Sequence, residues 1–372
     1  PNKKGKMFEL SGVNPFDAQI AQWDLVKNHR KLKSRIRKGI PQQLRSLVWQ
    51  NLCGSRERRK LECERYKNSK LLYQDLVQKK KSPYHDQLWK DINRTYRHQI
   101  RFGGVGIELK KKLGKKKQQK IKNNTNNNNN NNNNSLQPGS ENEPKIIEIG
   151  KHKIHKGISG PQELSQNATE AQQGLYNVLK AMSLYRTDIG YCQGMQAITA
   201  LLLMHMTEEE AFWVLASLAD DVRYQMEFLW RPSMPAIQLR FYQMERFVRI
   251  VLPKLAAHFE KHQIISASMY QASQWFITVF LATELKFETV IRIWDIYLSE
   301  GLKTIYRMGL GILKYFEKEL LKSDFEGMLK IFRNGPSTID TEKYIETCFS
   351  FKITHAQLQA FERDFNRQQN GN

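Results

Sequence analysis

Two polar residues in the segment Leu88–Thr95 have the types and spacing to present a positioned cation. Asp91 and Arg94 stand three residues apart, so on a helix they share one face. The carboxylate can then hold the guanidinium in place while its remaining donors point outward. The alternative interpretation is an ordinary ion pair on the surface of a helix.

A second segment of this kind, Gly190–Met195, comes directly before an apolar run that starts at Ala197. Glycines on both sides allow the backbone to turn tightly and to approach a partner closely. Tyr191 and Gln193 are therefore expected to project from the start of a helix, where they could contact another molecule. The alternative is a plain helix N-terminus that carries one stray polar residue.

Other catalytic patterns are missing from the sequence. It contains no G-x-x-x-x-G-K-[ST] phosphate loop, no G-x-S-x-G elbow and no H-E-x-x-H helix, so hydrolase chemistry of its own is not indicated. His152 and His155 lack a third metal ligand, and the four cysteines show no C-x-x-C spacing. We expect no metal, no cofactor of its own and a reducing compartment.

The positive charge is concentrated in two regions. The 372 residues include 59 Lys and Arg against 37 Asp and Glu. Residues 27–81 hold 18 basic and 4 acidic residues, residues 101–160 hold 13 and 4, and the remainder is nearly neutral. The second region combines lysine runs with eleven Asn between Asn123 and Asn134, a composition that predicts a disordered insertion. Contact of such a segment with an acidic membrane surface or RNA is the alternative.

The ends and the apolar runs of the sequence bear on its cellular location. The sequence begins at Pro1 rather than Met and shows no signal peptide, which indicates a fragment of a longer protein. The longest apolar stretch, Ala197–Met206, is interrupted by His205 and has about half of the ~20 residues that a membrane span needs. We expect a cytoplasmic protein.

Helical spacing dominates the second half of the chain, and strand-like alternation is nearly absent. Thr207 followed by Glu210 is a capping-box signature at one helix start. Further helices are predicted over Met269–Leu285, Thr304–Leu321 and Phe325–Phe332. The sequence therefore predicts an all-α domain of a dozen or more helices.

Two helices show how such patterns begin and end. One apolar stripe repeats over two turns, and Gly301 is expected to end its helix with a left-handed residue. The members of this stripe are Val290, Ile293, Trp294, Tyr297 and Leu298. In the N-terminal part, Ile40-Pro41 places a proline at a first helical turn, before Leu44, Leu47 and Val48.

Together these segments resemble the TBC domain, the catalytic module of Rab GTPase-activating proteins. The resemblance covers nearly the whole ordered chain and rests on six blocks in the order of the family. The opening R-x-G-I-P…R…W signature is similar to Arg37-Lys38-Gly39-Ile40-Pro41 with Arg45, Val48 and Trp49. The I-x-x-D-x-x-R motif is similar to Leu88-x-x-Asp91-x-x-Arg94, with Leu in place of Ile.

The remaining four blocks lie after the insertion. The Y-x-Q motif is similar to Tyr191-x-Gln193, and the later S-x-W-F, R-I-W-D and E-G-L blocks are similar to Ser273–Phe276, Arg292–Asp295 and Glu300–Leu302. The amino-acid sequence from Phe241 to Gly335 is most similar to that of the subfamily that carries a coiled coil after the TBC domain. Because this sequence ends at Asn372, that extension is expected to be missing or cut away.

The resemblance implies that two side chains act in trans on a Rab-family GTPase in its GTP-bound state, in regulating vesicle trafficking. Arg94 would be the arginine finger that stabilises charge on the phosphoryl oxygens. Gln193 would be the glutamine finger that orients the attacking water in place of the GTPase's own glutamine. GTP and Mg²⁺ would be carried by the GTPase, so the chain would need no cofactor of its own.

Supporting roles follow for the other matched residues. Asp91 would position the arginine finger, and Tyr191 would help to seat the switch region of the partner. Arg45 and Trp49 would help to position the catalytic helix, whereas Asp295 and the Trp before it are expected to be structural.

The expected organisation is a TBC domain in two helical subdomains, interrupted by the insertion. The parts are an N-terminal extension over 1–30, the first part of the domain over 31–102, the insertion over 103–160, the remainder over 161–350, and a C-terminal helix and tail over 351–372. Because loop closure costs only ~0.6 kcal/mol per doubling of length, the fold should tolerate the insertion.

Two other functions compete with GTPase activation. A non-catalytic Rab-binding scaffold would keep the fold, although the presence of both Arg94 and Gln193 counts against it. A binder of nucleic acid or of acidic membranes would use the two basic regions, with steep salt dependence and indifference to Arg94. We expect no specific nucleic acid, and contact with an acidic membrane surface only as a peripheral association with endomembranes.

Overall fold

The computed structural model describes residues 23, 29–65, 72–79, 82–95, 168–263 and 273–371. Within these ranges every regular element is a helix, and no strand occurs. The all-α prediction is therefore confirmed. The predicted insertion over 103–160 lies outside the described residues. No helix in the described ranges is long and apolar enough to span a membrane.

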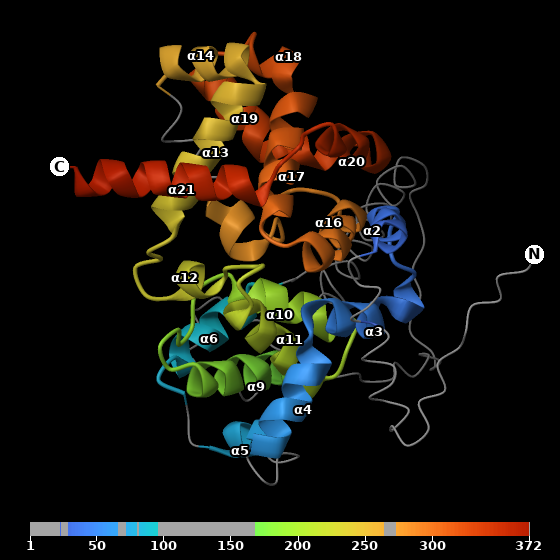
Figure 1. The fold of residues 1–372 in the computed structure, drawn as a ribbon. Helices are drawn as coiled ribbons and strands as arrows, with labels where there is room; N and C mark the ends of the chain where they lie inside the picture. Colours follow the sequence, from blue (N-terminus) through green and yellow to red (C-terminus); the bar gives the residue numbers. More distant parts are fainter. Residues whose placement is uncertain are drawn as a thin grey trace, which may run out of the picture.

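The helices gather in a lower and an upper half (Figure 1). The first helices along the chain are α2 (Arg30–Arg37), α3 (Gln42–Cys53), α4 (Ser55–Arg65), α5 (Leu72–Gln78) and α6 (His85–Ile92). The lower half contains α3 to α6 together with α9 (Glu170–Tyr185), α10 (Met195–Leu203), α11 (Glu208–Asp220) and α12 (Glu227–Trp230), whereas α2 lies beside α16. The remaining helices are α13 (Ile237–Val251), α14 (Pro253–Lys261), α16 (Phe287–Glu300), α17 (Lys303–Tyr315), α18 (Glu317–Leu320), α19 (Phe325–Asn334), the 3-10 helix η2 (Gly335–Thr338), α20 (Thr341–Phe349) and α21 (His355–Asn370).

Helix α11 forms the centre of the lower half. Nine consecutive residues, 211–219, are buried, so the helix is enclosed on all sides, and it packs against α4, α9 and α10. It starts with the predicted capping box, in which the Thr207 amide donates to Glu210 Oε2 at 2.9 Å. The buried α11 gives the helices around it a fixed frame.

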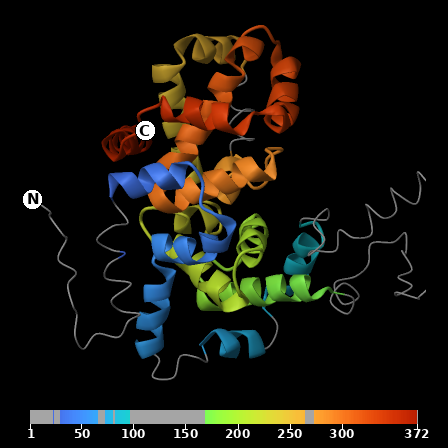
Figure 2. The same cartoon turned by 90° about the vertical axis from the view of Figure 1, so that its right-hand side faces the viewer.

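Helix α16 joins the two halves. It packs against α2 and α3 on the N-terminal side and against α17 on the other, and Figure 2 shows α2 lying along it. Gly301 ends the helix with the positive φ that the sequence predicts, 72°, although its ψ of −156° lies outside the left-handed helical region. A Cβ at this position would lie 2.5 Å from the carbonyl oxygen of Arg223, so only glycine fits.

One predicted helix is shorter than expected. The segment Met269–Leu285 is helical over the described residues 273–278 and then breaks, because Val279 and Phe280 have φ values of 48° and 66°. The break turns the carbonyl of Val279 toward Trp294, whose indole N–H donates to it at 3.1 Å. A buried hydrogen-bond requirement thus outweighs the helical pattern.

The helix predicted after Pro41 is present as α3, but its apolar stripe is not the buried face. Leu44 and Leu47 are exposed, whereas Trp49, Leu52 and Cys53 are buried. The orientation of α3 is therefore set by the contacts of its C-terminal half.

Candidate functional site

Helix α6, which leads into the Asp91 and Arg94 motif, is held firmly against α9. The Trp89 ring stacks on Tyr176 with centroids 4.8 Å apart and planes 13° apart. His85 Nδ1 lies 2.6 Å from the hydroxyl of the same tyrosine. These two contacts with Tyr176 fix the position of α6 along its own axis and its rotation about that axis.

Arg94 lies in the turn that follows α6. Its guanidinium pairs with Asp91 Oδ1, and its Nε donates to the carbonyl of Lys90 at 3.3 Å. The Arg94 side chain is 61% exposed, whereas that of Asp91 is 3% exposed. A buried carboxylate therefore holds an exposed cation at the C-terminal end of a helix, where the helix dipole also favours positive charge.

Tyr191 connects the second motif to the first. Its hydroxyl donates to Asp91 Oδ2 at 2.8 Å. Burial, reinforced by the adjacent Asp91 carboxylate, raises the pKa of Tyr191 well above its usual value, so the hydroxyl keeps its proton. The expectation that Tyr191 projects outward is corrected here, because the side chain is buried and points to Asp91.

Gln193 is exposed and directly precedes Gly194, the N-cap of α10. No hydrogen bond of its side chain to other described residues is present. Because Gln193 is only two residues from Tyr191, the bond between Tyr191 and Asp91 brings the segments that carry Gln193 and Arg94 together. Of the predicted site residues, these four are joined by the structure.

Two glycines shape the loop from residue 186 to residue 194, which we call the Gln193 loop. Gly190 has a φ of 63°, and a Cβ there would lie 2.1 Å from the Tyr84 hydroxyl. Gly194 has a φ of 115°, and a Cβ there would lie 2.7 Å from Ile277 Cγ2. The loop is thus clamped between the start of α6 and the segment before α16.

Gln196 is a site residue that the sequence analysis missed. Its Oε1 accepts the N–H of Gly194 at 2.6 Å and lies 2.9 Å from the hydroxyl oxygen of Tyr191. The single proton of that hydroxyl is best directed to the charged Asp91. The available signal was a polar residue at the second position of an otherwise largely apolar helix.

A group of ion pairs, the Arg186 network, holds the base of the Gln193 loop and was also missed. Its members are Arg58, Arg186, Asp188, Asp220, Glu227 and Arg231. Arg186 pairs with Asp188 at 2.7 Å and with Glu227 of α12 at 3.1 Å, and it also contacts Asp220 of α11. The hydrogen bond from Arg186 holds the pKa of Asp188 well below its usual range.

Arg45 and Trp49 lie at a different carboxylate, that of Asp295 on α16. Trp49 Nε1 donates to Asp295 Oδ1 at 2.7 Å, and Arg45 Nε donates to the same oxygen at 3.1 Å. The backbone N–H of Ile40 donates to Asp295 Oδ2 at 2.8 Å. The Trp49 ring also lies edge-on to His205, beyond the C-terminus of α10. These contacts reach α16 and α10 rather than α6, the helix that leads into the Asp91 and Arg94 motif.

At this site the described residues form neither a metal-ligand cluster nor an activated thiol. Among the described ranges, no group of three or more His, Cys, Asp and Glu could hold a metal ion. Cys192, beside Gln193, has its pKa raised by burial to about 11. Its thiol is therefore protonated at neutral pH and is a poor nucleophile.

The family model named Rab-GTPase-TBC domain matches residues 106–321, more than half of the chain. The chain belongs to this family. The matched range contains Tyr191 and Gln193, whereas Asp91 and Arg94 precede it.

Curated relatives of this TBC domain are longer proteins. The human protein named "Ecotropic viral integration site 5 protein homolog" is 31% identical over 93% of this chain and 34% of its own length. The Caenorhabditis elegans protein named "Rab GTPase-activating protein tbc-11" is 34% identical over 58% of this chain and 23% of its own length. The chain thus spans about a quarter to a third of these relatives.

Solved structures share the fold of this TBC domain at low identity. The Chlamydomonas flagellar RabGAP TBC domain has a TM-score of 0.56 and 22% identity, over 90% of this chain and 89% of that one. The Ypt/Rab-GAP domain of Gyp1p has a TM-score of 0.55 and 17% identity, over 91% of this chain and 97% of that one. The predicted TBC fold is therefore confirmed.

Proposed function

We propose that this TBC domain is a GTPase-activating protein that supplies Arg94 and Gln193 in trans to a Rab-family GTPase in its GTP-bound state. The observation that carries the proposal is the hydrogen bond between Tyr191 and Asp91. It ties together two segments that each end in an exposed side chain, one a guanidinium and the other a carboxamide. GTP and Mg²⁺ are carried by the GTPase.

In this mechanism Arg94 stabilises negative charge that builds up on the phosphoryl oxygens. A guanidinium supplied in trans accelerates hydrolysis ~10³–10⁵-fold, which lowers the barrier by roughly 4–7 kcal/mol. The pair with Asp91 sets the direction of the side chain before the partner arrives, which limits the rotamer entropy lost on binding. The planar fork can bridge two phosphate oxygens, which a lysine ammonium cannot do.

Gln193 has the second role, orientation of the attacking water. A carboxamide offers both a donor and an acceptor, so it can hold a water molecule and a backbone group at the same time. Its two flanking segments are fixed by the bond of Tyr191 to Asp91 and by Gly194 at the start of α10. The finger therefore sits on a short, well-anchored turn.

The supporting residues act through the catalytic side chains or through the frame. Asp91 positions Arg94, and Tyr191 positions Asp91 instead of contacting the partner directly. Arg45 and Trp49 support the site indirectly, by fastening α3 to α16 through Asp295.

Three finer assignments belong to the same proposal. We assign the chain to the subfamily with a coiled coil after the TBC domain, on the similarity of its sequence over residues 241–335. The basic residues of 27–81 serve as a peripheral contact for acidic membrane surfaces, in keeping with a role in vesicle trafficking. No specific nucleic acid is bound.

A single-turnover GTPase screen against a Rab panel tests the mechanism. Arg94→Ala, Arg94→Lys and Gln193→Ala should each lower the stimulated rate, with Arg94→Ala close to the unstimulated rate and about 10³-fold below wild type. Arg65→Ala is the matched control for the arginine, because Arg65 is exposed and forms an i,i+3 pair with Glu62. Gln43→Ala is the control for the glutamine, since Gln43 is exposed on α3.

The outcomes separate the competing functions. A wild-type protein that binds a GTP-loaded Rab without accelerating hydrolysis would be a scaffold. Binding to any polyanion with steep salt dependence, unchanged in Arg94→Ala, would indicate a nucleic-acid or membrane binder. Loss of helical circular dichroism together with activity would make Arg94 structural.

A further inference from the structure

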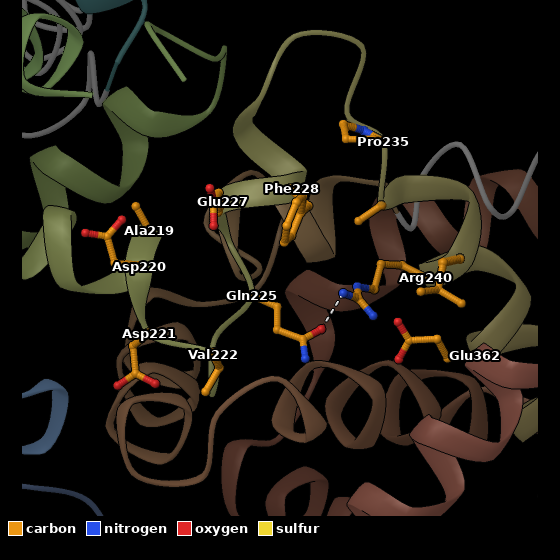
Figure 3. Close-up of a pocket in the computed structure, with 12 residues that line it drawn as sticks. Ala219, Asp220, Asp221, Val222, Gln225, Glu227, Phe228, Pro235, Arg240 and Glu362 are labelled. Carbon is orange, nitrogen blue, oxygen red and sulfur yellow. Dashed lines mark hydrogen bonds between the residues drawn. The ribbon is translucent and has the colours of Figure 1, made fainter. Parts of the chain in front are cut away.

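A pocket of about 360 Å³ lies between the end of α11, α12, the start of α13 and α21. Figure 3 shows the residues that line it, with Arg240 directed toward Gln225 at its centre and Glu362 beside them. Half of the lining side chains are apolar, namely Ala219, Val222, Phe228, Pro235, Ala236 and Leu239. The pocket is large enough for one apolar side chain and a neighbouring polar group.

Arg240 is a buried cation that forms no ion pair with another described residue. The residue is 3% exposed, and its terminal nitrogens donate to the side-chain oxygens of Gln243 at 2.9 Å and Gln225 at 2.5 Å. Its Nε has no hydrogen-bond partner among the described residues. Arg307, which is similarly buried, pairs with Glu300 at 2.9 Å. A buried guanidinium whose hydrogen-bond partners, the Gln225 and Gln243 amides and the Tyr306 hydroxyl, are all neutral leaves a charge for a ligand to satisfy.

Three of the four carboxylates that line the pocket are already neutralised. Asp220 pairs with Arg58 and Arg186, Asp221 pairs with Arg223, and Glu227 pairs with Arg186 and Arg231. Glu362 forms no ion pair with another described residue and is partly exposed on α21. The pocket therefore contains one unmatched cation on its floor and one unmatched, more exposed anion at its wall.

The mouth of the pocket is apolar and continuous with the Gln193 loop. Val222 and Phe228 are both exposed at the rim. The Arg231 guanidinium lies 5.2 Å from the centroid of the Phe228 ring, and the same side chain pairs with Asp188 at 3.1 Å. Asp188 belongs to the Gln193 loop, so a protein that contacts Gln193 can also reach this mouth.

We propose that the pocket receives an apolar side chain of the partner GTPase together with an adjacent carboxylate, which binds Arg240. This inference rests on the proposed GTPase-activating function and adds to it a contact that selects the partner. Burial decides the assignment, because Arg240 is more deeply buried than Glu362 and therefore gains more from a partner of opposite charge. Glu362 competes with that carboxylate and can move aside, since its side chain is partly exposed and forms no ion pair with another described residue.

The first test compares two exposed phenylalanines. Phe228→Ala should raise KM for a responsive GTPase about tenfold, because truncating an aromatic anchor at an interface commonly costs that much affinity. The rate constant kcat should change little, since Arg94 and Gln193 are intact. Phe325→Ala on α19 is the matched control, because Phe325 is 39% exposed and Phe228 is 47% exposed. Equal KM values for both variants would overturn the proposal.

Glu362→Gln tests the sign of the charge that is recognised. Removing a competing carboxylate should lower KM by roughly threefold, since a partly exposed like charge contributes a fraction of a tenfold change in affinity. A rise in KM would mean that Glu362 itself binds a cation of the partner, which contradicts the proposal. Arg240 is left unchanged, because its loss would remove a buried donor from both Gln225 and Gln243.

A third measurement does not need the GTPase. The full chain is titrated with the capped dipeptides Ac-Leu-Glu-NH2, Ac-Leu-Gln-NH2 and Ac-Leu-Lys-NH2, and the arginine Nε–H signals are followed by NMR. The glutamate peptide should shift the Arg240 signal most, and Glu362→Gln should strengthen its binding. If no Rab responds to the wild-type chain, the proposed function fails. The peptide titration would still show whether the pocket binds an apolar side chain with an adjacent carboxylate. Preference for the lysine peptide, or no shift with any peptide, would overturn the inference.

Discussion

The hydroxyl of Tyr191 donates a 2.8 Å hydrogen bond to the buried carboxylate of Asp91, across a separation of 100 residues. The other oxygen of Asp91 pairs with Arg94, so one carboxylate orients elements of both motifs. Its position is in turn fixed by α6, whose Trp89 stacks on α9. The two exposed side chains therefore depend on one buried group.

Replacing Tyr191 by Phe should reduce stimulated GTP hydrolysis more than it reduces stability. The change removes one donor from Asp91 and should lower the free energy of unfolding by about 1–3 kcal/mol, because a buried acceptor is left unsatisfied. Asp91 and Arg94 then lose their fixed orientation, so kcat should fall with little change in KM. Single-turnover rates and urea denaturation of the same preparations measure both effects.

Tyr73→Phe is the matched control for this prediction. Tyr73 and Tyr191 are both 7% exposed, and each donates a 2.8 Å hydrogen bond to a carboxylate, Glu208 for Tyr73. The two variants should lose similar stability, but only Tyr191→Phe should lose kcat. If kcat falls equally in both, Tyr191 acts through general stability and not through Asp91.

Local features of this site could be predicted from the sequence because their partners are close along the chain. The pair of Asp91 with Arg94 spans three residues, and so does the capping box of Thr207 with Glu210. The positive φ of Gly301 could be predicted from its residue type alone. In each case the geometry follows from helical spacing or backbone sterics.

Features that depend on tertiary packing could not be predicted in the same way. Tyr191 follows glycine before a helix, a pattern that indicates exposure, yet its surroundings are set by the position of α6. Gln196 accepts a backbone N–H only because the Gln193 loop folds back on the first turn of α10. Arg186 contacts Glu227, which lies 41 residues away on another helix.

Gly190→Ala should damage both the fold and the site. A Cβ at this position would lie 2.1 Å from the Tyr84 hydroxyl, in a residue with a φ of 63°. Gly54→Ala separates the two effects, because Gly54 has a φ of 71° but nothing within 4 Å of its Cβ. The control should lose about 1–2 kcal/mol of unfolding free energy from backbone strain alone.

The Gly190 variant should lose more stability than the Gly54 variant and should also lose GTPase stimulation, since Tyr84 must move away from the Gln193 loop. Thermal unfolding and single-turnover rates of the two variants provide the comparison. Equal losses of stability would mean that the Tyr84 ring adjusts without cost.

The Arg186 network should remain intact in mildly acidic solution. The pKa of Asp188 is depressed in the folded state, so its ionised form stabilises the fold above the unfolded pKa of about 3.9. That contribution declines once the pH falls below the unfolded pKa, and it is gone below the lower, folded pKa. The stability difference between wild type and Asp188→Asn should therefore be constant from about pH 5 to pH 8 and shrink below about pH 4.

Urea denaturation of both proteins at several pH values measures this difference. Glu245→Gln is a suitable control, because Glu245 forms an i,i+4 pair with Arg249 on α13, away from the Gln193 loop. A difference for Asp188→Asn that already disappears near pH 6 would show that Arg186 does not hold the Asp188 carboxylate in its ionised form.

Asp295→Asn should destabilise the protein without changing the chemistry of the folded molecules. The carboxylate is fully buried and accepts hydrogen bonds from Ile40, Arg45 and Trp49, of which the Arg45 guanidinium is charged. The amide group of Asn would place its N–H donors against the N–H donors of these three residues, and Arg45 would lose its anionic partner. We expect the free energy of unfolding to fall by roughly 3–5 kcal/mol. Because these contacts join α3 to α16 and not to α6, kcat per folded molecule should stay within about twofold, a small fraction of the barrier. Circular dichroism melting, followed by single-turnover assays below the melting temperature, separates the two quantities. A large fall in kcat in fully folded protein would instead mean that Arg45 and Trp49 orient the fingers through α16 or α10.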